Sequence, residues 1–369
     1  MLGKMLRFLK KTESHDGLIP LAVPQETSEI VDRMEGCVLL GASGDAMGYA
    51  VEFKQVDEIV QSFNGPVSFS DPLRWRHRGH GYMVSDDTQM TMFGMEAIAR
   101  SIEEHPDDYC SVLIDEIRRS YIEWYGTQGR LAVSSSGPGL LSYREMFAAR
   151  APGNTCLEAL RIGGNGSVHR PINDSKGCGG VMRVAPLAFI PGVDEDALWS
   201  LSTASAALTH GHVLGWASAG ALALVIRKIV MGMSIREAVT ASVVDMRRNR
   251  SCPEMAEVLE RSLVYAGRRE MKTDQIEALG GGWVGEECLL IGTVAALMDA
   301  DVPSRMGVAV NHGGDSDSTA CVAGQLMGAH YGRKRLENMH SIGDIFRDLD
   351  VARPLSYVMN RFGKAIHQS

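Results

Sequence analysis

Apolar residues recur at helical spacing along most of this chain, and no stretch shows sustained strand-like alternation. The first such segment begins at Thr27 and continues through Gly48. Its apolar face follows intervals of three and four residues, which match a helix of 3.6 residues per turn: Ile30, Met34, Cys37, Val38 and Gly41. Similar patterns cover residues 89–98, 108–124, 214–230, 234–246, 254–266, 286–298 and 319–330. Because strands do not alternate with helices, an α/β dinucleotide-binding sheet is a poor fit, and we predict a compact all-α fold.

Small residues in the first helix predict a close neighbour. Gly41, Gly44 and Gly48 are spaced by three and four residues. Each glycine costs a helix up to ~1 kcal/mol relative to alanine, so several in one helix need a compensating contact. We therefore expect a second helix to pack closely here.

Composition narrows the class of protein. The chain has 369 residues, of which 45% are hydrophobic and 22% are charged, as in a globular enzyme with a sizeable core. The net charge of -8 argues against general nucleic-acid binding, which needs a basic face. We expect no membrane span, because no apolar run approaches ~20 residues, and no secretory signal. The seven cysteines form no C-x-x-C pair, which favours reduced thiols and a cytoplasmic location over zinc or disulfides.

Residues 1–26 differ from the rest and are interpreted as an N-terminal extension to a domain spanning residues 27–369. Apolar residues at helical spacing alternate with lysine and arginine in residues 2–11, and a polar stretch with Pro20 and Pro24 follows. A frayed terminus explains this pattern, as does a docking arm for an acidic partner. Membrane attachment is a weaker alternative, because one short helix binds weakly without a lipid.

Two acidic clusters lie far apart in the chain, at Ser85-Asp86-Asp87-Thr88 and Asp315-Ser316-Asp317-Ser318. Carboxylate and hydroxyl oxygens are the ligands that Mg²⁺ and Mn²⁺ select. Each cluster alone is also a plausible helix N-cap. Capping does not explain adjacent Asp86 and Asp87, because the second side chain adds repulsion. An EF-hand is excluded for the second cluster, whose loop would have Ala320 in place of glycine and Leu326 in place of glutamate.

Three further segments carry glycine or charge. Gly177–Arg183 is a glycine-rich loop that would let backbone N–H groups approach a phosphate, although a plain turn before a helix explains it equally well. Thr209-His210-Gly211-His212 precedes a small-residue helix, where a histidine is commonly a packing group. The basic segment Arg74–Arg78 could steer a diphosphate or a modified protein, or be a solvated loop.

Taken in order, the motifs G-D-A-x-G-x-x-x-E, S-D-D-T, G-x-G-G-x-M-R, T-H and G-G-D-x-D-S resemble those of the ADP-ribosylglycohydrolase family. They cover roughly residues 34–332 and are most similar to the bacterial dinitrogenase-reductase-activating type. The resemblance implies a compact orthogonal helical fold with two Mg²⁺ or Mn²⁺ ions in a central cleft. It also implies hydrolysis of the N-glycosidic bond between ADP-ribose and a protein side chain, usually arginine.

The resemblance also assigns roles by motif. It places the metal ligands in two groups, at Ser85, Asp86 and Asp87 and at Asp315, Asp317 and Ser318, with serine where the family often has threonine. It implies Glu52 and Asp317 as catalytic residues. It implies substrate-binding roles for Gly179, Gly180, Val181, Met182 and His210. Thr88 is expected to start a helix, and Asp45 to support the metal ligands by hydrogen bonding.

These roles predict an ADP-ribosylarginine hydrolase that acts on ADP-ribosylated proteins and reverses the work of an ADP-ribosyltransferase toxin. The alternative is an immunity protein that blocks such a toxin by direct contact through residues 1–26. Two divalent ions are the expected cofactors, and no nucleic-acid partner is expected.

Overall fold

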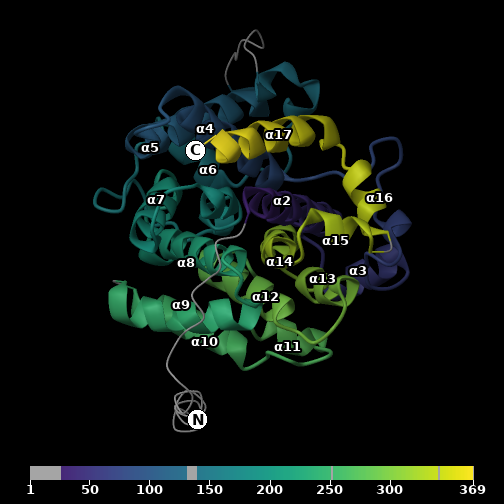
Figure 1. The fold of residues 1–369 in the computed structure, drawn as a ribbon. Helices are drawn as coiled ribbons and strands as arrows, with labels where there is room; N and C mark the ends of the chain where they lie inside the picture. Colours follow the sequence, from purple (N-terminus) through teal and green to yellow (C-terminus); the bar gives the residue numbers. More distant parts are fainter. Residues whose placement is uncertain (1–25, 131–138, 251, 340, 369) are drawn as a thin grey trace.

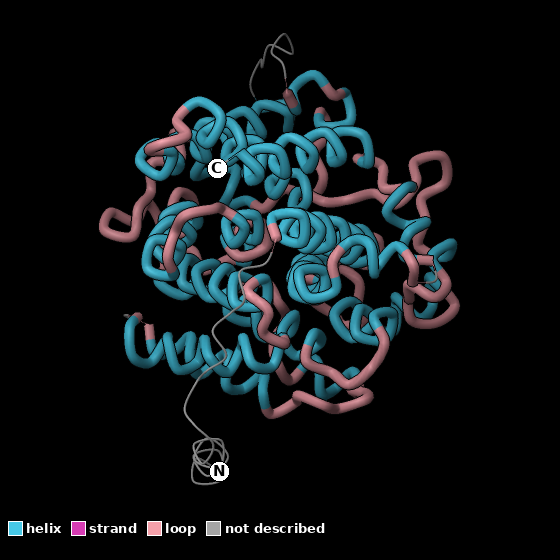
Figure 2. Tube along the Cα trace, viewed as in Figure 1, coloured by secondary structure: helices cyan, strands magenta, loops and turns pink. Residues whose placement is uncertain are grey.

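A computed structural model describes residues 26–130, 139–250, 252–339 and 341–368 (Figure 1). Within these ranges the chain forms helices joined by loops, and isolated β-bridges such as Gly177 with Val284 take the place of strands (Figure 2). The predicted all-α fold is therefore confirmed. The extension predicted at residues 1–26 lies, apart from Glu26, outside the described residues.

In the part of the chain that the structure describes, ten helices have eleven residues or more. They are α2 (Thr27–Tyr49), α4 (Asp86–Glu104), α5 (Tyr109–Tyr125), α7 (Glu195–Ala207), α8 (Val213–Val230), α9 (Ile235–Asn249), α10 (Pro253–Leu263), α12 (Gly285–Ala296), α14 (Ser316–Tyr331) and α17 (Ala352–Gln368). Shorter α-helices are α3 (Val56–Phe63), α6 (Asn154–Arg161), α11 (Thr273–Glu277), α13 (Val302–Val310), α15 (Arg333–Glu337) and α16 (Ile342–Arg347). Single turns include η4 (Arg144–Met146), η5 (Cys178–Gly180) and η6 (Ala185–Phe189). All eight segments with predicted helical spacing are helices, whereas α7 and α17 were not predicted.

The α2 and α14 helices lie side by side at the centre of the molecule (Figure 1). Their backbones meet through glycines, as the spacing in α2 predicts. A β-carbon at Gly44 would lie 2.7 Å from the carbonyl carbon of Ala320, and one at Gly36 would lie 2.6 Å from the carbonyl oxygen of Gly328. No larger residue fits at these positions without moving a backbone. This close contact brings the end of α2 beside the start of α14.

The α8 helix corrects one expectation from the sequence. Its 18 residues have a mean hydropathy of 1.6, which meets the length and composition of a membrane span, although no such run was expected. However, 78% of this segment is buried, and the helix packs against α7, α9 and α12. A buried apolar helix in contact with its neighbours is the core helix of a globular fold.

Candidate metal centre

The two acidic clusters meet because each begins a central helix. Ser85 caps α4 by accepting a hydrogen bond from the Asp87 N–H at 3.2 Å. Asp315 caps α14, with its carboxylate 3.4 Å from the Ser318 N–H. The capping interpretation therefore holds for one residue of each cluster, and it leaves the neighbouring carboxylates unexplained.

Five carboxylates converge at this point, and we refer to Glu52, Asp86, Asp87, Asp315 and Asp317 as the carboxylate cluster. Ligand oxygens of Glu52, Asp315 and Asp317 lie within 4.8 Å of one another. Asp86 and Asp87 lie close enough for the charge of Asp317 to act on both. The exposed fraction is at most 5% for the four aspartates and 9% for Glu52. The structure thus brings four of the six predicted metal ligands together with a predicted catalytic residue.

Burial and mutual repulsion disfavour ionisation of this cluster. Burial, followed by the charges of Asp317 and Asp315, raises the pKa of Glu52 to about 10. The same two causes, burial first and then Asp317, hold the pKa of Asp86, Asp87 and Asp315 well above its usual range. Within the described part of the chain, none of the five carboxylates forms an ion pair with lysine, arginine or histidine. Buried charges need a partner, so this donor set calls for cations from solution.

The donor set fits hard divalent ions. Glu52 Oε2 and Asp87 Oδ2 are buried and have no hydrogen-bond partner on the protein. Buried polar atoms are normally satisfied, so two unpaired oxygens in one acidic cluster are consistent with ligands of an ion. Since nearly all the donors are carboxylate oxygens, Mg²⁺ or Mn²⁺ fits better than zinc.

Asp45 holds the two helix ends together. Its carboxylate accepts hydrogen bonds from the Ser85 N–H at 2.8 Å and the Thr88 N–H at 3.1 Å, and the Thr88 hydroxyl also donates to it. Burial and then the charge of Asp317 raise the pKa of Asp45 to about 7. Asp45 therefore links the end of α2 to the first turn of α4 and positions Asp86 and Asp87. This contact is the supporting role that the sequence predicts.

The glycine loop lies against the second half of the cluster. Gly179, Gly180, Val181 and Met182 are all buried. The Met182 carbonyl accepts a hydrogen bond from Gln325 Nε2 of α14 at 2.6 Å, which ties the loop to that helix. A β-carbon at Gly179 would lie 2.8 Å from His210 Cε1. Close packing against the histidine thus requires glycine at this position, whether or not a phosphate binds on the other side.

His210 lies beneath the loop and outside the carboxylate cluster. It is 1% exposed, and its Nδ1 is 2.8 Å from the Thr209 hydroxyl. Burial, followed by the charge of Arg183, lowers the pKa of His210 to about 3, so the ring is neutral at physiological pH. A neutral imidazole here can position the loop or accept a hydrogen bond, but it does not supply positive charge.

Two features of the site were missed by sequence reasoning. The Cys178 thiol donates a hydrogen bond to Asp315 Oδ2 at 2.8 Å. Phe53 and Trp283 stack with ring centroids 5.6 Å apart and remain 68% and 43% exposed. Phe53 follows Glu52 directly, and the Trp283 carbonyl accepts a hydrogen bond from the Cys178 N–H at 3.2 Å. An exposed aromatic pair therefore borders the cluster. The run of three glycines directly before Trp283 was the sequence signal that could have indicated this aromatic pair.

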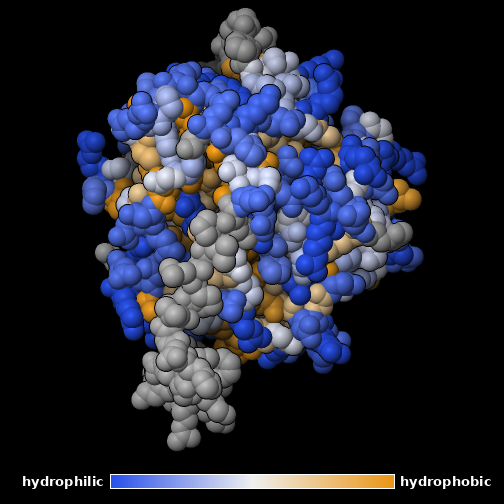
Figure 3. Space-filling view, viewed as in Figure 1, coloured by the Kyte–Doolittle hydropathy of each residue, from blue (hydrophilic) through white to orange (hydrophobic). Residues whose placement is uncertain are grey.

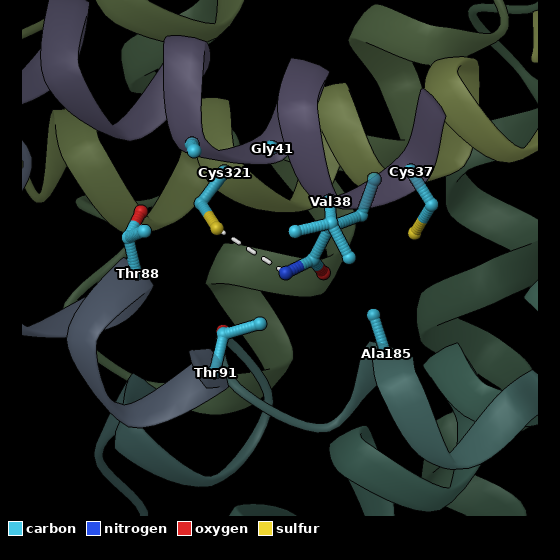
Figure 4. Close-up of a pocket in the computed structure, with 9 residues that line it drawn as sticks. Cys37, Val38, Gly41, Thr88, Thr91, Ala185 and Cys321 are labelled. Carbon is cyan, nitrogen blue, oxygen red and sulfur yellow. Dashed lines mark hydrogen bonds between the residues drawn. The ribbon is translucent and has the colours of Figure 1, made fainter. Parts of the chain in front are cut away.

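A small cavity behind the cluster is lined by α2, α4, α14 and η6 (Figure 4). In this view Thr88, Thr91 and Cys321 surround the cavity. Its volume is about 10 Å³, which is room for one water molecule at most. A sugar nucleotide does not fit in this cavity.

Comparisons with known proteins agree on one family. The family model described as ADP-ribosylglycohydrolase matches residues 26–349. An ADP-ribosyl-[dinitrogen reductase] glycohydrolase from Rhodospirillum rubrum is 24% identical over 309 residues, covering 82% of this chain and 86% of that protein. An uncharacterized protein from Archaeoglobus fulgidus is 23% identical over 303 residues, covering 81% and 87%. A solved structure of an ADP-ribosylglycohydrolase-related protein complex superposes with a TM-score of 0.60 at 23% identity, covering 92% of this chain and 99% of that one.

Proposed function

The chain belongs to the ADP-ribosylglycohydrolase family, and we propose that it removes ADP-ribose from arginine side chains of modified proteins with the help of two divalent ions. The observation that carries this proposal is the carboxylate cluster, which is buried and, among the described residues, has no cationic partner and retains two unpaired oxygens. If this cluster bound no ion, its buried carboxylates would destabilise the fold and nothing would compensate for that cost.

Ser85, Asp86 and Asp87 would hold the ions from α4, and Asp315, Asp317 and Ser318 from α14. Mg²⁺ or Mn²⁺, when bound, would polarise ribose hydroxyls and lower the pKa of a bound water. Both serine side chains lie at the first turns of these helices. Their hydroxyls would add one oxygen donor to each set of carboxylates.

Glu52 is the residue best placed to move a proton. Guanidine is a poor leaving group unless it departs protonated, so the reaction needs an acid near the glycosidic nitrogen. A protonated Glu52 would donate its proton to the leaving nitrogen, and the resulting carboxylate would then accept a proton from the attacking water. Such assistance is worth ~10²–10⁴-fold in rate. Asp317 lies within 4.8 Å of Glu52 and would hold the reacting groups in place.

Arginine is the linkage that the sequence resemblance implies, and the comparisons support the coarser point that the substrate is a modified protein. The Rhodospirillum rubrum relative is named as a glycohydrolase of ADP-ribosylated dinitrogen reductase, which is a modified protein. The proposed biological role is reversal of the modification made by an ADP-ribosyltransferase toxin.

Three ADP-ribosylated proteins with arginine, serine and cysteine linkages, incubated with and without chelator, test this function. Release of ADP-ribose from the arginine-linked protein alone, and only without chelator, is the expected result. Release from the serine-linked protein instead would contradict the linkage. No release from any of them would leave direct toxin binding as the better account.

That second account rests on the basic amphipathic pattern of residues 2–11, which suits an acidic surface. The chain would then block the toxin by contact through residues 1–26. Deleting these residues separates the two roles: catalysis should persist, while toxin binding should fall at least ~10-fold. Unchanged toxin binding would show that the extension is not the docking element.

A further inference from the structure

A second polar cavity of about 700 Å³ lies next to the carboxylate cluster. We call it the arginine groove, after the five arginines that line it: Arg76, Arg144, Arg150, Arg347 and Arg353. They come from three segments far apart in the sequence, which are the loop before α4, the region of η4, and the junction of α16 and α17. Hydrophilic residues cover the part of Figure 3 where α16 and the start of α17 lie in Figure 1.

The arginine groove is positive in a protein of net charge -8. Its lining has three carboxylates against five arginines, and each carboxylate is already paired. Arg76 pairs with Asp348 at 2.5 Å, Arg150 with Asp350, and Arg353 with Glu145 at 3.7 Å. The two remaining arginines therefore provide an excess of positive charge.

These two remaining arginines are exposed to solvent. Arg144 forms no ion pair in the part of the chain that the structure describes. Arg347 pairs with Asp344, which lies outside the groove lining. The Arg144 guanidinium group is thus available to a carboxylate from another molecule, and Arg347 could exchange its exposed partner Asp344 for one.

The groove shares a wall with the carboxylate cluster. Arg150 Nη1 donates to the Val84 carbonyl at 3.0 Å, and Asp350 Oδ1 accepts from the Val84 N–H at 3.1 Å. The Arg150 carbonyl accepts a hydrogen bond from the Asp86 N–H at 3.0 Å. Val84 and Asp86 are two residues apart, so this wall lies within ~7 Å of a predicted metal ligand along the chain. A ligand in the groove would lie beside the reacting centre.

We propose that the arginine groove binds an acidic segment of the protein that carries the ADP-ribosylated side chain. This proposal rests on the proposed hydrolase function. A modified protein is too large to enter the buried cluster, and the hydrogen bonds of Arg150 and Asp350 to Val84 place the groove beside it. A volume of 700 Å³ holds a few peptide side chains. Phe, Tyr and Trp are absent from the lining within the described residues, and the charge of the groove therefore comes without the large aromatic rings that favour a purine.

Binding of a fluorescein-labelled hexaglutamate peptide, with hexaglutamine as the neutral control, tests the groove without relying on catalysis. The double variant Arg144→Glu/Arg353→Glu reverses two exposed charges of the lining. The matched control is Arg269→Glu, because the Arg269 side chain is 85% exposed and that of Arg353 is 81% exposed. We expect hexaglutamate to bind the wild type and Arg269→Glu alike and the double variant at least ~10-fold more weakly at low salt. Equal binding to the double variant, or none to the wild type, would overturn the proposal.

Kinetics on two substrates provides the second readout. For an ADP-ribosylated acidic protein at low salt, the double variant should raise KM about 10-fold with kcat unchanged, and the difference should shrink at about 0.5 M salt. For ADP-ribosylated agmatine, a guanidine with no protein around it, KM should not change. An equal rise for both substrates would place ADP-ribose itself in the groove and overturn the proposal. A wild type inactive on both would reject the hydrolase function, while the peptide measurement would still decide whether the groove binds acidic segments.

Discussion

On one side of the segment from Val84 to Asp86, five buried carboxylates face one another, and no lysine, arginine or histidine of the described chain pairs with them. On the other side, three of five arginines are paired with carboxylates of the same groove. The carboxylate cluster lowers the stability of the fold until an ion binds. In the arginine groove, the carboxylates are paired and the excess positive charge is exposed to solvent. The difference teaches that unpaired buried charge marks the reacting centre, while exposed charge marks a surface for recognition.

The largest effect should come from removing a cluster carboxylate. Asp317→Ala or Asp87→Ala should reduce ADP-ribose release by more than ~10³-fold, because each removes a ligand that also restrains its neighbours. Far-UV circular dichroism should show an unchanged helical fold. Asp299→Asn, a change at an exposed aspartate, is the control and should keep full activity. Full activity of either cluster variant with the metal chelated would rule out the metal site.

The same cluster should weaken the fold when no metal is present. Asp317→Asn removes one of the repelling charges that act on Glu52, Asp86 and Asp87. In EDTA it should therefore stabilise the protein by about 1–3 kcal/mol, measured by urea unfolding. With saturating Mn²⁺ the order should reverse, because only the wild type gains binding energy. A variant less stable than the wild type in EDTA would contradict the repulsion inferred here.

The carboxylate cluster should also make the stability of the metal-free protein depend on pH. Glu52, with its pKa raised to about 10, keeps a proton in the native state that the unfolded chain has released above about pH 4.5. Stability contributed by such a group is present at low pH and is lost as pH rises toward the folded pKa. His210 and His312, whose pKa values fall to about 3 and about 4, are neutral in both states above pH 7 and do not interfere. The Tm in EDTA should thus decrease from pH 7 to pH 8, and saturating Mg²⁺ should flatten this slope. If Tm fell with pH equally steeply with and without Mg²⁺, the ion would not bind beside Glu52, and the inferred metal site would be contradicted.

The smallest effect should come from the paired charges of the arginine groove. The Arg76 and Asp348 side chains are 36% and 43% exposed, so their ion pair is screened by solvent. Arg76→Ala should change stability by less than ~1 kcal/mol and leave kcat on a small guanidine substrate unaltered. Thermal unfolding and steady-state kinetics would measure both. A large loss of stability would mean that the groove is a structural ion-pair network.

The sequence was most informative where one residue type determines the local structure. Helical spacing located eight of the ten longer helices, and the glycine spacing in α2 predicted the close contact with α14. The sequence also indicated that the two acidic clusters form one site, because both helix starts consist of hydroxyl and carboxylate side chains. The α17 helix was missed, although its apolar residues follow the same spacing around Leu355 and Phe362.

Contacts made across the fold were beyond the sequence. Cys178 looked like an ordinary buried thiol, and only the fold places it beside Asp315. Gly179 suggested a phosphate loop, yet the same glycine is needed for packing on His210. The basic segment Arg74–Arg78 is exposed except for Trp75, which is buried, and Arg74 pairs with Asp71. Arg76 alone of these three contributes to the groove, next to arginines 68 or more positions away.

Metal binding to the chelator-treated protein tests the central claim most directly. Calorimetric titration with Mn²⁺ should reveal two sites per chain in the wild type and a loss of at least one of them in Asp317→Asn. Binding should be unaffected in Asp299→Asn. If the wild type bound no divalent ion, or Asp317→Asn bound Mn²⁺ as the wild type does, the carboxylate cluster would not be the metal centre.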